Sequence, residues 1–555
     1  MSTGKNESTL SLIKSFDPMF WVASIMELFE RWAWYGLFAV LALYLTGSTD
    51  DGGLGFTHTE KGQIMGIVTA ILYLLPLFTG IISDKIGYKL SLVISYIMLM
   101  TGYYFMGEVT SYTAVFLIFL WVAVGAAMFK PVASAIVTKS TTKKNSTLGF
   151  GIFYMMVNIG GFIGPAFSSG LREKGWGLVF IQAAIVIGIN LIIVLIFYKE
   201  QERVKSNKGV LETIKESLNN IVEALKDTKL SVLLLIMIGF WTMFNQLFYT
   251  LPTFIEDWVD TSSVSKAITD FSPAIGNYIS SDGQIKPEWF TNIDAGMIIL
   301  LQILVSSFVI KMRHVTAMIR GFIIAIIGIS LTFYFKDVTF TILGVVIFAI
   351  GEMTTNPTFS SFIAIISPKG KEALYQGTYF VPIFVGNLLT TFVSGNLYQA
   401  WSDKLTLVKN YLGTKDIALT EVGTRYTENQ FLEKSANAFS ISVEKVRMLL
   451  SNDVFANKDW SLGIKELKEY AEENGIEDYG ALSAEFSKND YILAAAESLD
   501  MSKWEMTSVI WDNYSPNKIW WVISGIGVVT VSALIVYDNL VVKPREKNGA
   551  ATETE

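Results

Sequence analysis

The sequence predicts an all-α membrane protein whose twelve transmembrane helices form two bundles of six. The first observation is composition: 51% of the 555 residues are hydrophobic and only 17% are charged, whereas soluble proteins carry about 25% charged residues. The second is pattern, because long apolar runs alternate with short charged patches. Each run is long enough to cross about 30 Å of hydrocarbon as a helix.

The apolar runs fall into two sets of six on either side of a charged segment. The first set, the N-terminal bundle (19–198), has spans at 19–46, 61–82, 88–107, 112–138, 150–171 and 176–198. The second set, the C-terminal bundle (230–401 and 518–541), has spans at 230–255, 293–312, 315–335, 339–366, 376–401 and 518–541. Residues 199–229 are charged and amphipathic, which predicts a linker with a surface helix on the cytoplasmic side.

Lysine and arginine placement predicts the orientation of the spans. Basic residues concentrate in every second loop and at the C-terminal end: Lys85, Lys89, Lys139, Lys143, Lys144, the 199–229 linker, Lys311, Arg313, Arg320, Lys369, Lys371, Lys543, Arg545 and Lys547. Cytoplasmic loops carry this excess. Both termini are therefore expected in the cytoplasm, with the protein in the inner membrane and the lipid bilayer as its surroundings.

Two segments lie outside this pattern. The N-terminal stretch 1–18 lacks the layout of a cleaved signal peptide, so the first apolar run is expected to remain as a helix. Residues 402–517, between spans 11 and 12, are mostly polar. Because they follow span 11 and the N-terminus is expected in the cytoplasm, they are expected outside the cytoplasm. There, 462–475 and 491–512 predict amphipathic helices of a small domain without a catalytic motif.

Composition also excludes several classes of function. The net charge of −7 without a sustained basic patch argues against nucleic acid as a partner. The chain has no cysteine and only two histidines, His58 and His314, so thiol chemistry and a multi-histidine metal site are not expected. No nucleophile–base pair or phosphate-binding loop is evident. We therefore expect neither an enzyme nor a cofactor.

Ionisable residues inside apolar spans indicate function, because their burial is costly. Glu27, Glu30 and Arg31 fall within the first span, and helical spacing puts both glutamates on roughly one face beside the arginine. Such a cluster can hold and exchange a proton. The alternative is a buried ion triad that only fixes helix packing.

Two further charged residues lie in different halves of the chain. Lys130 is in span 4, ahead of Pro131, and Glu352 is in span 10, ahead of Pro357. Proline in a helix is expected to kink or loosen it. A Lys130–Glu352 pair would join the two bundles, and a zwitterionic ligand bound between them would replace that pair. Alternatively, backbone and water satisfy each charge locally.

Polar and aromatic side chains in other spans suit the lining of a cavity. The candidates are Tyr35, Tyr73, Tyr154, Asn158, Asn245, Gln246, Asp294 and Tyr379, although each on its own is more often a packing residue. Asp294 could instead lie near the outer end of its span, in contact with water. The loop between spans 2 and 3 has Gly80, Asp84 and Gly87, which favour close helix approach, capping and a tight turn.

These motifs resemble those of a known family. The loop pattern Gly80, Asp84, Lys85, Gly87 and Lys89 is similar to the signature of the major facilitator superfamily. Further elements, in the same order along the chain, resemble the proton-dependent oligopeptide transporters of that superfamily: 27–35 (ELFERWAWY), 73–76 (YLLP), Lys130-Pro131, 153–165 (FYMMVNIGGFIGP), 241–246 (WTMFNQ) and Gly351-Glu352. The resemblance extends over nearly the whole chain except 402–517.

The resemblance implies the major facilitator fold and a role for each matched position. Glu27, Glu30 and Arg31 would couple proton movement to transport. The peptide-binding residues would be Arg31 and Lys130 for the carboxylate, Glu352 with Asn158 for the amino group, and Tyr35, Tyr73, Asp294 and Tyr379 in the pocket wall. Lys130, Glu352, Gly80 and Asp84 would serve gating.

The chain departs from the family pattern at several positions. Asn245 replaces an acid and Phe38 an arginine that often form a pair, so a gate interaction is missing. Asp294 stands where an asparagine is usual, and Tyr379 where a tryptophan is common. Gly66 aligns with a histidine of the animal members, so proton coupling is expected to rest on the glutamates.

The sequence thus predicts a symporter that imports di- and tripeptides with protons by alternating access. One alternative is a transporter of the same fold for another small solute, such as an amino-acid conjugate, an anion or a drug. Glu352 and Asp294 disfavour a simple anion. The other alternative is a membrane receptor or assembly protein acting through 402–517.

Overall fold

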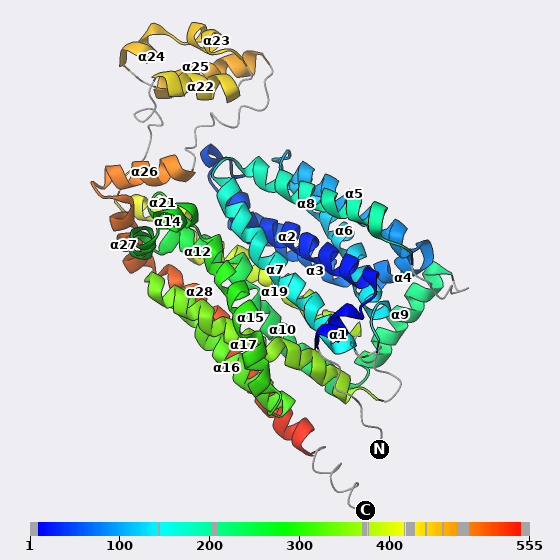
Figure 1. Cartoon of the computed structure of the whole chain (residues 1–555). Helices are drawn as coiled ribbons and strands as arrows, with labels where there is room; N and C mark the ends of the chain where they lie inside the picture. The colour runs from blue at the N-terminus through cyan, green and yellow to red at the C-terminus, as the bar shows by residue number, and fades with distance from the viewer. Residues whose placement is uncertain are drawn as a thin grey trace, which may run out of the picture. The chain divides into compact units, whose positions relative to one another are not determined.

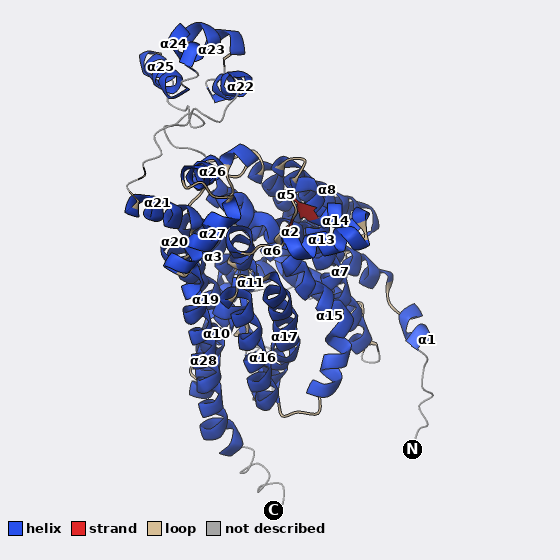
Figure 2. Ribbon diagram, turned by 90° about the vertical axis from the view of Figure 1, so that its left-hand side faces the viewer, coloured by secondary structure: helices blue, strands red, loops and turns tan. Residues whose placement is uncertain are grey.

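The computed structural model of the chain describes residues 9–142, 145–200, 209–368, 375, 377–415, 417, 428–438, 441–457, 460–474 and 488–544. They are almost entirely helical (Figures 1 and 2). The chain divides into two compact units. The first unit comprises Met1–Tyr44, Phe56–Ser402 and Pro516–Glu555, and the second comprises Leu45–Gly55 and Asp403–Ser515.

The N-terminal half of the first unit has seven long helices after a short one. These are α1 (Thr9–Lys14), α2 (Pro18–Thr46), α3 (His58–Leu74), α4 (Pro76–Ile86), α5 (Tyr88–Met106), α6 (Tyr112–Lys139), α7 (Ser146–Arg172) and α8 (Trp176–Phe197). The linker helix α9 (Val210–Leu225) contacts α4 and α10. Linker residues 201–208 lie outside the described residues, as do Lys143, Lys144, Lys369, Lys371, Arg545 and Lys547 of the basic loops.

The C-terminal half contains α10 (Thr228–Phe244), α11 (Gln246–Tyr249), α12 (Leu251–Trp258), α15 (Glu288–Val309), α16 (His314–Tyr334), α17 (Val338–Ile366), α19 (Phe380–Thr391), the π-helix η2 (Phe392–Leu397), α20 (Tyr398–Trp401), η4 (Pro516–Lys518), α28 (Ile519–Tyr537) and η5 (Asp538–Val542). Between α12 and α15 lie α13 (Ser262–Phe271), α14 (Pro273–Ile279) and an antiparallel hairpin of β1 (Ser280–Ser281) and β2 (Gln284–Ile285).

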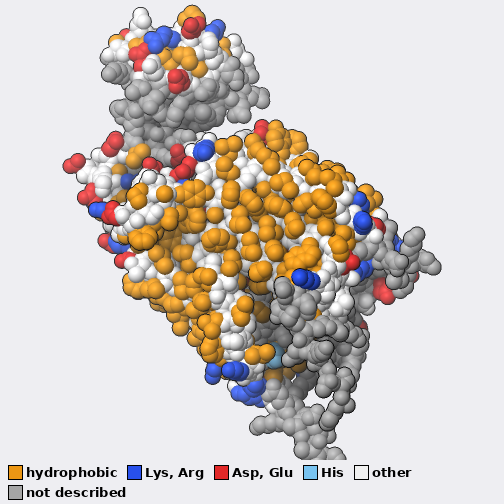
Figure 3. Space-filling model, viewed as in Figure 1, with side chains coloured by type: hydrophobic (Ala, Val, Ile, Leu, Met, Phe, Trp, Pro, Cys, Tyr) orange, Lys and Arg blue, Asp and Glu red, His pale blue; other side chains and the backbone are white. Residues whose placement is uncertain are grey.

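The length and apolar character of the helices fit a multi-span membrane protein. Among the described residues, ten helices are long and apolar enough to cross a membrane, and the count is eleven if the bent pair α3–α4 is taken as one span. Helix α2 has 29 residues but is not among them, because Glu27, Glu30 and Arg31 lower its mean hydropathy. One face of the molecule is covered by hydrophobic side chains, with charged side chains gathered toward the ends (Figure 3).

Prolines affect the spans differently. Helices α6 and α17 continue through Pro131 and Pro357. Span 2, predicted as continuous, is instead broken before Pro76, and α3 and α4 meet at an angle of 48°. Proline lacks the N–H that would continue the helical hydrogen bonds. The tight turn predicted after α4 is present, with Gly87 at a φ of +105°, where glycine avoids the steric cost of a side chain.

The two halves of the first unit pack together along one end of their helices. Helix α3 packs against α19 and η2, and α7 packs against α15. A Cβ atom on Gly62 would lie 2.7 Å from Cα of Gly395, so the backbones of α3 and η2 are in direct contact. Across the same interface, Lys61 Nζ donates a 2.9 Å hydrogen bond to the carbonyl oxygen of Tyr249.

The opposite ends of the two halves are less closely joined. In the described part of the chain, neither α4 nor α6 packs extensively against a helix of the C-terminal half. The ring contact between Tyr73 and Phe380, at a centroid distance of 6.5 Å, lies toward that end. If the termini are cytoplasmic, as the basic loops predict, the structure is closed to the outside and faces inward.

The second unit contains the helices of the 402–517 segment. A four-helix cluster of α22 (Glu428–Ala438), α23 (Val443–Leu449), α24 (Asn452–Asn457) and α25 (Trp460–Glu473) has its own apolar core, which includes Phe431, Leu432, Val446 and Leu467. Helices α21 (Lys404–Thr414), α26 (Lys488–Ser498) and α27 (Lys503–Tyr514) pack together separately. The helix predicted at 462–475 corresponds to α25, whereas that predicted at 491–512 is divided between α26 and α27.

Candidate functional site

A cavity of about 220 Å³ lies between the two halves of the first unit. Helices α2, α3 and α7 supply one wall, and α10, α11, α15, α17 and α19 supply the other. Ligand sites between bundles of this kind are typical of transporters. The lining residues predicted from the sequence are Tyr35, Tyr73, Tyr154, Asn158, Asn245, Asp294 and Glu352.

The C-terminal wall of the cavity is acidic. Asp294 of α15 is 4% exposed and Glu352 of α17 is 8% exposed, and both line the cavity. Asp294 therefore lies deep in the protein and not at the water-exposed end of its span, the alternative that its position in the sequence left open. Asn356, four residues after Glu352 on the same helix, also lines the cavity and accepts a 2.8 Å hydrogen bond from Tyr379.

The predicted cluster of span 1 is formed and buried. Arg31 is in contact with Glu30, and its Nε atom lies 3.4 Å from Oε1 of Glu27. The exposed fractions of Glu27, Glu30 and Arg31 are 6%, 0% and 5%. None of the three lines the cavity, but the Arg31 guanidinium lies 5.9 Å from the ring centre of Tyr35, which does.

Lys130 does not line the cavity but lies next to a tyrosine that does. Its Nζ atom lies 4.6 Å from the ring centre of Tyr73, a cavity-lining residue. Lys130 makes no ion pair within 4.0 Å among the described residues, and the hypothetical Lys130–Glu352 pair is therefore absent from this conformation. The cations Arg31 and Lys130 of the N-terminal half thus lie next to the cavity-lining Tyr35 and Tyr73.

Asn245 and Phe38, the uncharged residues that replace the acid and arginine of the gate pair, contact other uncharged groups. The Asn245 amide nitrogen lies 3.4 Å from the Thr390 hydroxyl as a hydrogen-bond donor. Phe38 packs edge-on against Tyr249 at a centroid distance of 5.6 Å. Because Asn245 and Phe38 both line the cavity, this part of its wall carries no charge.

The loop residues assigned to gating lie at the opposite end of the helices from the α3–η2 contact. A Cβ atom on Gly80 would lie 3.4 Å from Pro131 of α6, so the glycine permits close approach of α4 to α6. Asp84 accepts a 2.9 Å hydrogen bond from the Tyr88 hydroxyl across the turn. These contacts are local to the N-terminal half.

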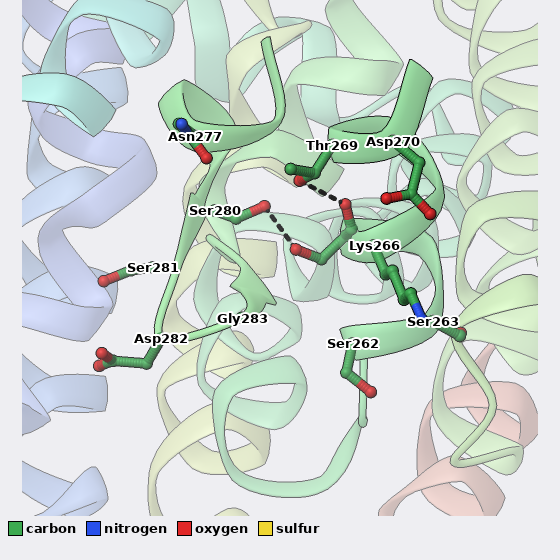
Figure 4. A pocket seen from close by; sticks show the side chains of 11 residues that line it. Ser262, Ser263, Lys266, Thr269, Asp270, Asn277, Ser280, Ser281, Asp282 and Gly283 are labelled. Carbon is green, nitrogen blue, oxygen red and sulfur yellow. Dashed lines mark hydrogen bonds between the residues drawn. The ribbon is translucent and has the colours of Figure 1, made fainter. Parts of the chain in front are cut away.

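A second hollow, lined by hydroxyl groups, lies outside the spans. It is formed by α13, α14 and the β1–β2 hairpin (Figure 4). The hydroxyls of Ser265 and Ser280 are 2.8 Å apart and hydrogen bonded to each other, so they satisfy one another. Lys266 and Asp270 of this hollow are exposed, and they provide control positions for substitutions in the spans.

Comparison with known proteins places the chain among membrane transporters. Residues 23–269 match the model of the Major Facilitator Superfamily. An uncharacterized transporter, YclF, of Bacillus subtilis is 31% identical over 173 residues, which are 30% of this chain and 35% of YclF. Dipeptide and tripeptide permease B of Photorhabdus asymbiotica is 29% identical over 196 residues, which are 34% of this chain and 38% of the permease.

Solved structures share the fold. The peptide transporter POT, crystallised with sulfate, superimposes with a TM-score of 0.57 at 16% identity over 70% of this chain and 92% of that one. A single-residue mutant of the nucleoside transporter NupG superimposes with a TM-score of 0.59 at 12% identity over 94% of this chain and 99% of that one. The chain spans less than two fifths of the length of the first curated relatives it matches.

The fold is that of the major facilitator superfamily, whose model matches residues 23–269. The curated relatives include dipeptide and tripeptide permeases and a peptide transporter, which agrees with the resemblance to the proton-dependent oligopeptide transporters found in the sequence.

Proposed function

We propose that the protein is a proton-coupled symporter that imports di- and tripeptides across the inner membrane by alternating access. The observation that carries this proposal is the charge polarity of the cavity. Two acids line its C-terminal wall, and two cations lie next to tyrosines of its N-terminal wall. A short peptide has the complementary polarity, with an ammonium group at one end and a carboxylate at the other.

The two charged ends of the peptide would bind charged residues on the two sides of the cavity. Glu352, with Asn158 on the facing helix α7, would hold the ammonium group. The carboxylate would attract Lys130 and Arg31, whose charged groups lie 4.6 and 5.9 Å from the ring centres of the cavity-lining Tyr73 and Tyr35. Because these contacts bind only the termini of the peptide, peptides with many different side chains can bind.

The hypothesised cycle begins outward-open, with a proton on a glutamate of the span 1 cluster. Peptide binding closes the outer end, and the two halves rock about the site until it opens inward. Release of the proton returns Glu27 or Glu30 to its pair with Arg31, the arrangement seen in the structure. The membrane potential supplies about 2.3 kcal/mol per charge per 100 mV.

The test is uptake of a labelled dialanine by purified protein in liposomes under an inward proton gradient. We expect accumulation that collapses on addition of a protonophore. Absence of uptake of any short peptide by correctly inserted protein would favour the alternative, a transporter of another small solute. A likeness in fold to a nucleoside transporter is compatible with that alternative.

Lys130→Ala is expected to abolish accumulation in the same assay, because the buried peptide carboxylate then lacks its cation. The matched control is Lys266→Ala in the exposed hollow between α13 and the hairpin, which should leave uptake unchanged (Figure 4). Uphill transport retained by the Lys130→Ala variant would remove this lysine from the mechanism.

Removal of residues 418–487 tests the alternative that the insertion carries the function. The ends of the deletion can be joined by a short glycine–serine linker, because α21 and α26 pack together and Lys409 Nζ lies 5.1 Å from the ring centre of Tyr491. We expect uptake within about twofold of the full chain, since the four-helix cluster has its own core and folds on its own contacts. Loss of uptake in a correctly inserted deletion variant would assign the insertion a role in transport.

A further inference from the structure

Two ion pairs of opposite polarity join the two halves of the first unit at the outer end. Nε of Arg172, in the last turn of α7, lies 3.0 Å from Oε1 of Glu288, in the first turn of α15. Nζ of Lys286, which follows β2, lies 2.9 Å from Oε1 of Glu173, the residue directly after α7. Each half therefore supplies one cation and one anion to this contact, which fixes how the two halves meet.

The partners from the C-terminal half are buried. Glu288 is 0% exposed and Lys286 is 2% exposed, whereas Glu173 lies at the surface. The Lys286 ammonium group also donates a 2.6 Å hydrogen bond to the carbonyl oxygen of Tyr278. A charge held away from water without a partner is strongly destabilising. The closed arrangement of this end therefore depends on both ion pairs.

Neutral contacts continue from the ion pairs along α7 toward the cavity. The Ser169 hydroxyl oxygen accepts a 2.9 Å hydrogen bond from the indole of Trp289. The Ala166 carbonyl oxygen accepts a 2.9 Å hydrogen bond from the Tyr278 hydroxyl. Asn292, which lines the cavity, donates a 3.1 Å hydrogen bond to another carbonyl oxygen of α7. The contact thus extends from the outer surface to the cavity wall.

Helix α14 and the hairpin, together residues 273–287, form a strap that is attached to the C-terminal half. The Gln284 side-chain oxygen accepts hydrogen bonds of 2.7 and 2.8 Å from the backbone and hydroxyl of Thr261. The Ser280 hydroxyl is hydrogen bonded to Ser265 of α13 (Figure 4). These bonds lie within the segment between α12 and α15. Separation of the two halves is therefore expected to break the contacts with α7 and to leave the strap on the C-terminal half.

We propose that the Arg172–Glu288 and Lys286–Glu173 pairs form a latch, which holds the strap against α7 and releases it each time the cavity opens to the outside. Ion pairs suit a contact that parts repeatedly, because water solvates both partners of each pair once they separate. An apolar contact would instead expose its surface to water and resist opening. The latch goes beyond the proposed function, because it applies to any solute that enters the cavity from outside.

Glu288→Gln removes one partner of the latch. The amide keeps the shape of the side chain, but the closed state then holds Arg172 beside a neutral group. In the open state water surrounds the arginine, so the substitution penalises only the closed state. We expect the ratio of open to closed molecules to rise about tenfold or more.

The separation of the outer ends can be measured between two spin labels, because the chain has no cysteine of its own. Thr110→Cys, between α5 and α6, and Ser263→Cys, on α13, place one label on an exposed position of each half. Double electron–electron resonance on the purified protein should show mainly the short distance when the latch is intact. The Glu288→Gln variant should show an added population at a longer distance.

Glu173→Gln is a second variant whose position is exposed, so folding is expected to tolerate it. It leaves Lys286 without its carboxylate and should shift the two populations in the same direction. The matched control is Glu223→Gln, which breaks a 3.0 Å ion pair with Lys226 within the single helix α9. Because that pair does not join the two halves, we expect the control to keep the distances of the latched protein.

The outcomes separate the latch from the proposed function. Unchanged distances in both folded latch variants would overturn the latch, whatever the protein transports. A shift in the control as large as that in Glu288→Gln would overturn it as well, because the loss of any ion pair would then have the same effect. Failure of the wild-type protein to carry any peptide would refute the proposed function, and the distances would still decide whether the ion pairs hold the outer end closed.

Discussion

Glu30→Gln is expected to abolish proton-driven accumulation of dipeptide while the variant still exchanges peptide across the membrane. Glu30 is fully buried and in contact with Arg31. Glutamine keeps the shape of the side chain but cannot take up or release a proton. A proton driven by 100 mV supports about 40-fold accumulation, and the variant should lose this factor and only equilibrate its substrate. Uptake against a gradient and counterflow in liposomes measure the two activities.

The control for this variant is Glu212→Gln on the exposed linker helix α9, which should accumulate peptide normally. The alternative reading of the cluster, an ion triad that only fixes packing, predicts a different result. Breaking a buried pair costs about 3–5 kcal/mol of stability, so a packing role would lower the thermal stability and leave coupling intact. Full proton-driven uptake by either Glu30→Gln or Glu27→Gln would contradict the coupling scheme.

The positions of the spans follow from the sequence because hydrocarbon thickness dictates their length. The predicted span at 112–138, for example, is α6 at 112–139. The internal shape of the spans does not follow in the same way. The 48° bend before Pro76 was not predicted, whereas Pro131 and Pro357 lie within unbroken helices. Whether a proline bends a helix depends on neighbours that satisfy the freed carbonyl, and these come from other helices.

For the site, too, some contacts could be predicted from the sequence and others could not. Contacts within one helix could be predicted, as for Glu27 and Arg31, because helical spacing fixes them. Contacts between helices could not. Glu352 shares the cavity wall with Asp294 and not with Lys130, since this depends on how the helices are turned about their axes and on which end of the molecule is closed.

Several lining residues were not predicted as site residues. Asn356, Asn387 and Tyr249 all line the cavity. A signal for Asn356 was present, because it follows Glu352 by four residues and so shares its helix face. Asn387 is a polar residue within an apolar span, which by itself indicates an interior position. Tyr249 reaches both Asn387 and the α3 backbone only because α11 is a separate short helix.

Gly62→Ala is expected to open the outer end of the protein. A Cβ atom at this position would lie 2.7 Å from both the Gly395 Cα and the Thr391 carbonyl oxygen, and these backbone atoms can yield only if η2 and the end of α19 move away. Such overpacking costs about 1–3 kcal/mol, which shifts a two-state equilibrium by about 5- to 150-fold toward the outward-open state. The contact exists only when the outer end is closed, so the open state escapes the cost.

A single engineered cysteine makes this shift measurable, because the chain has no cysteine of its own. Ala295→Cys in the cavity wall should react with a membrane-impermeant thiol reagent from outside faster by that factor in the Gly62→Ala background. Gly525→Ala on α28 is the matched control, since a Cβ there meets no atom within 4 Å. Equal labelling rates in the Ala295→Cys protein with no further change, with Gly62→Ala and with Gly525→Ala would show that the α3–η2 contact does not set the balance between the inward and outward states. Faster labelling from the cytoplasmic side instead would place the closed end of the structure inside the cell and reverse the orientation predicted from the basic loops.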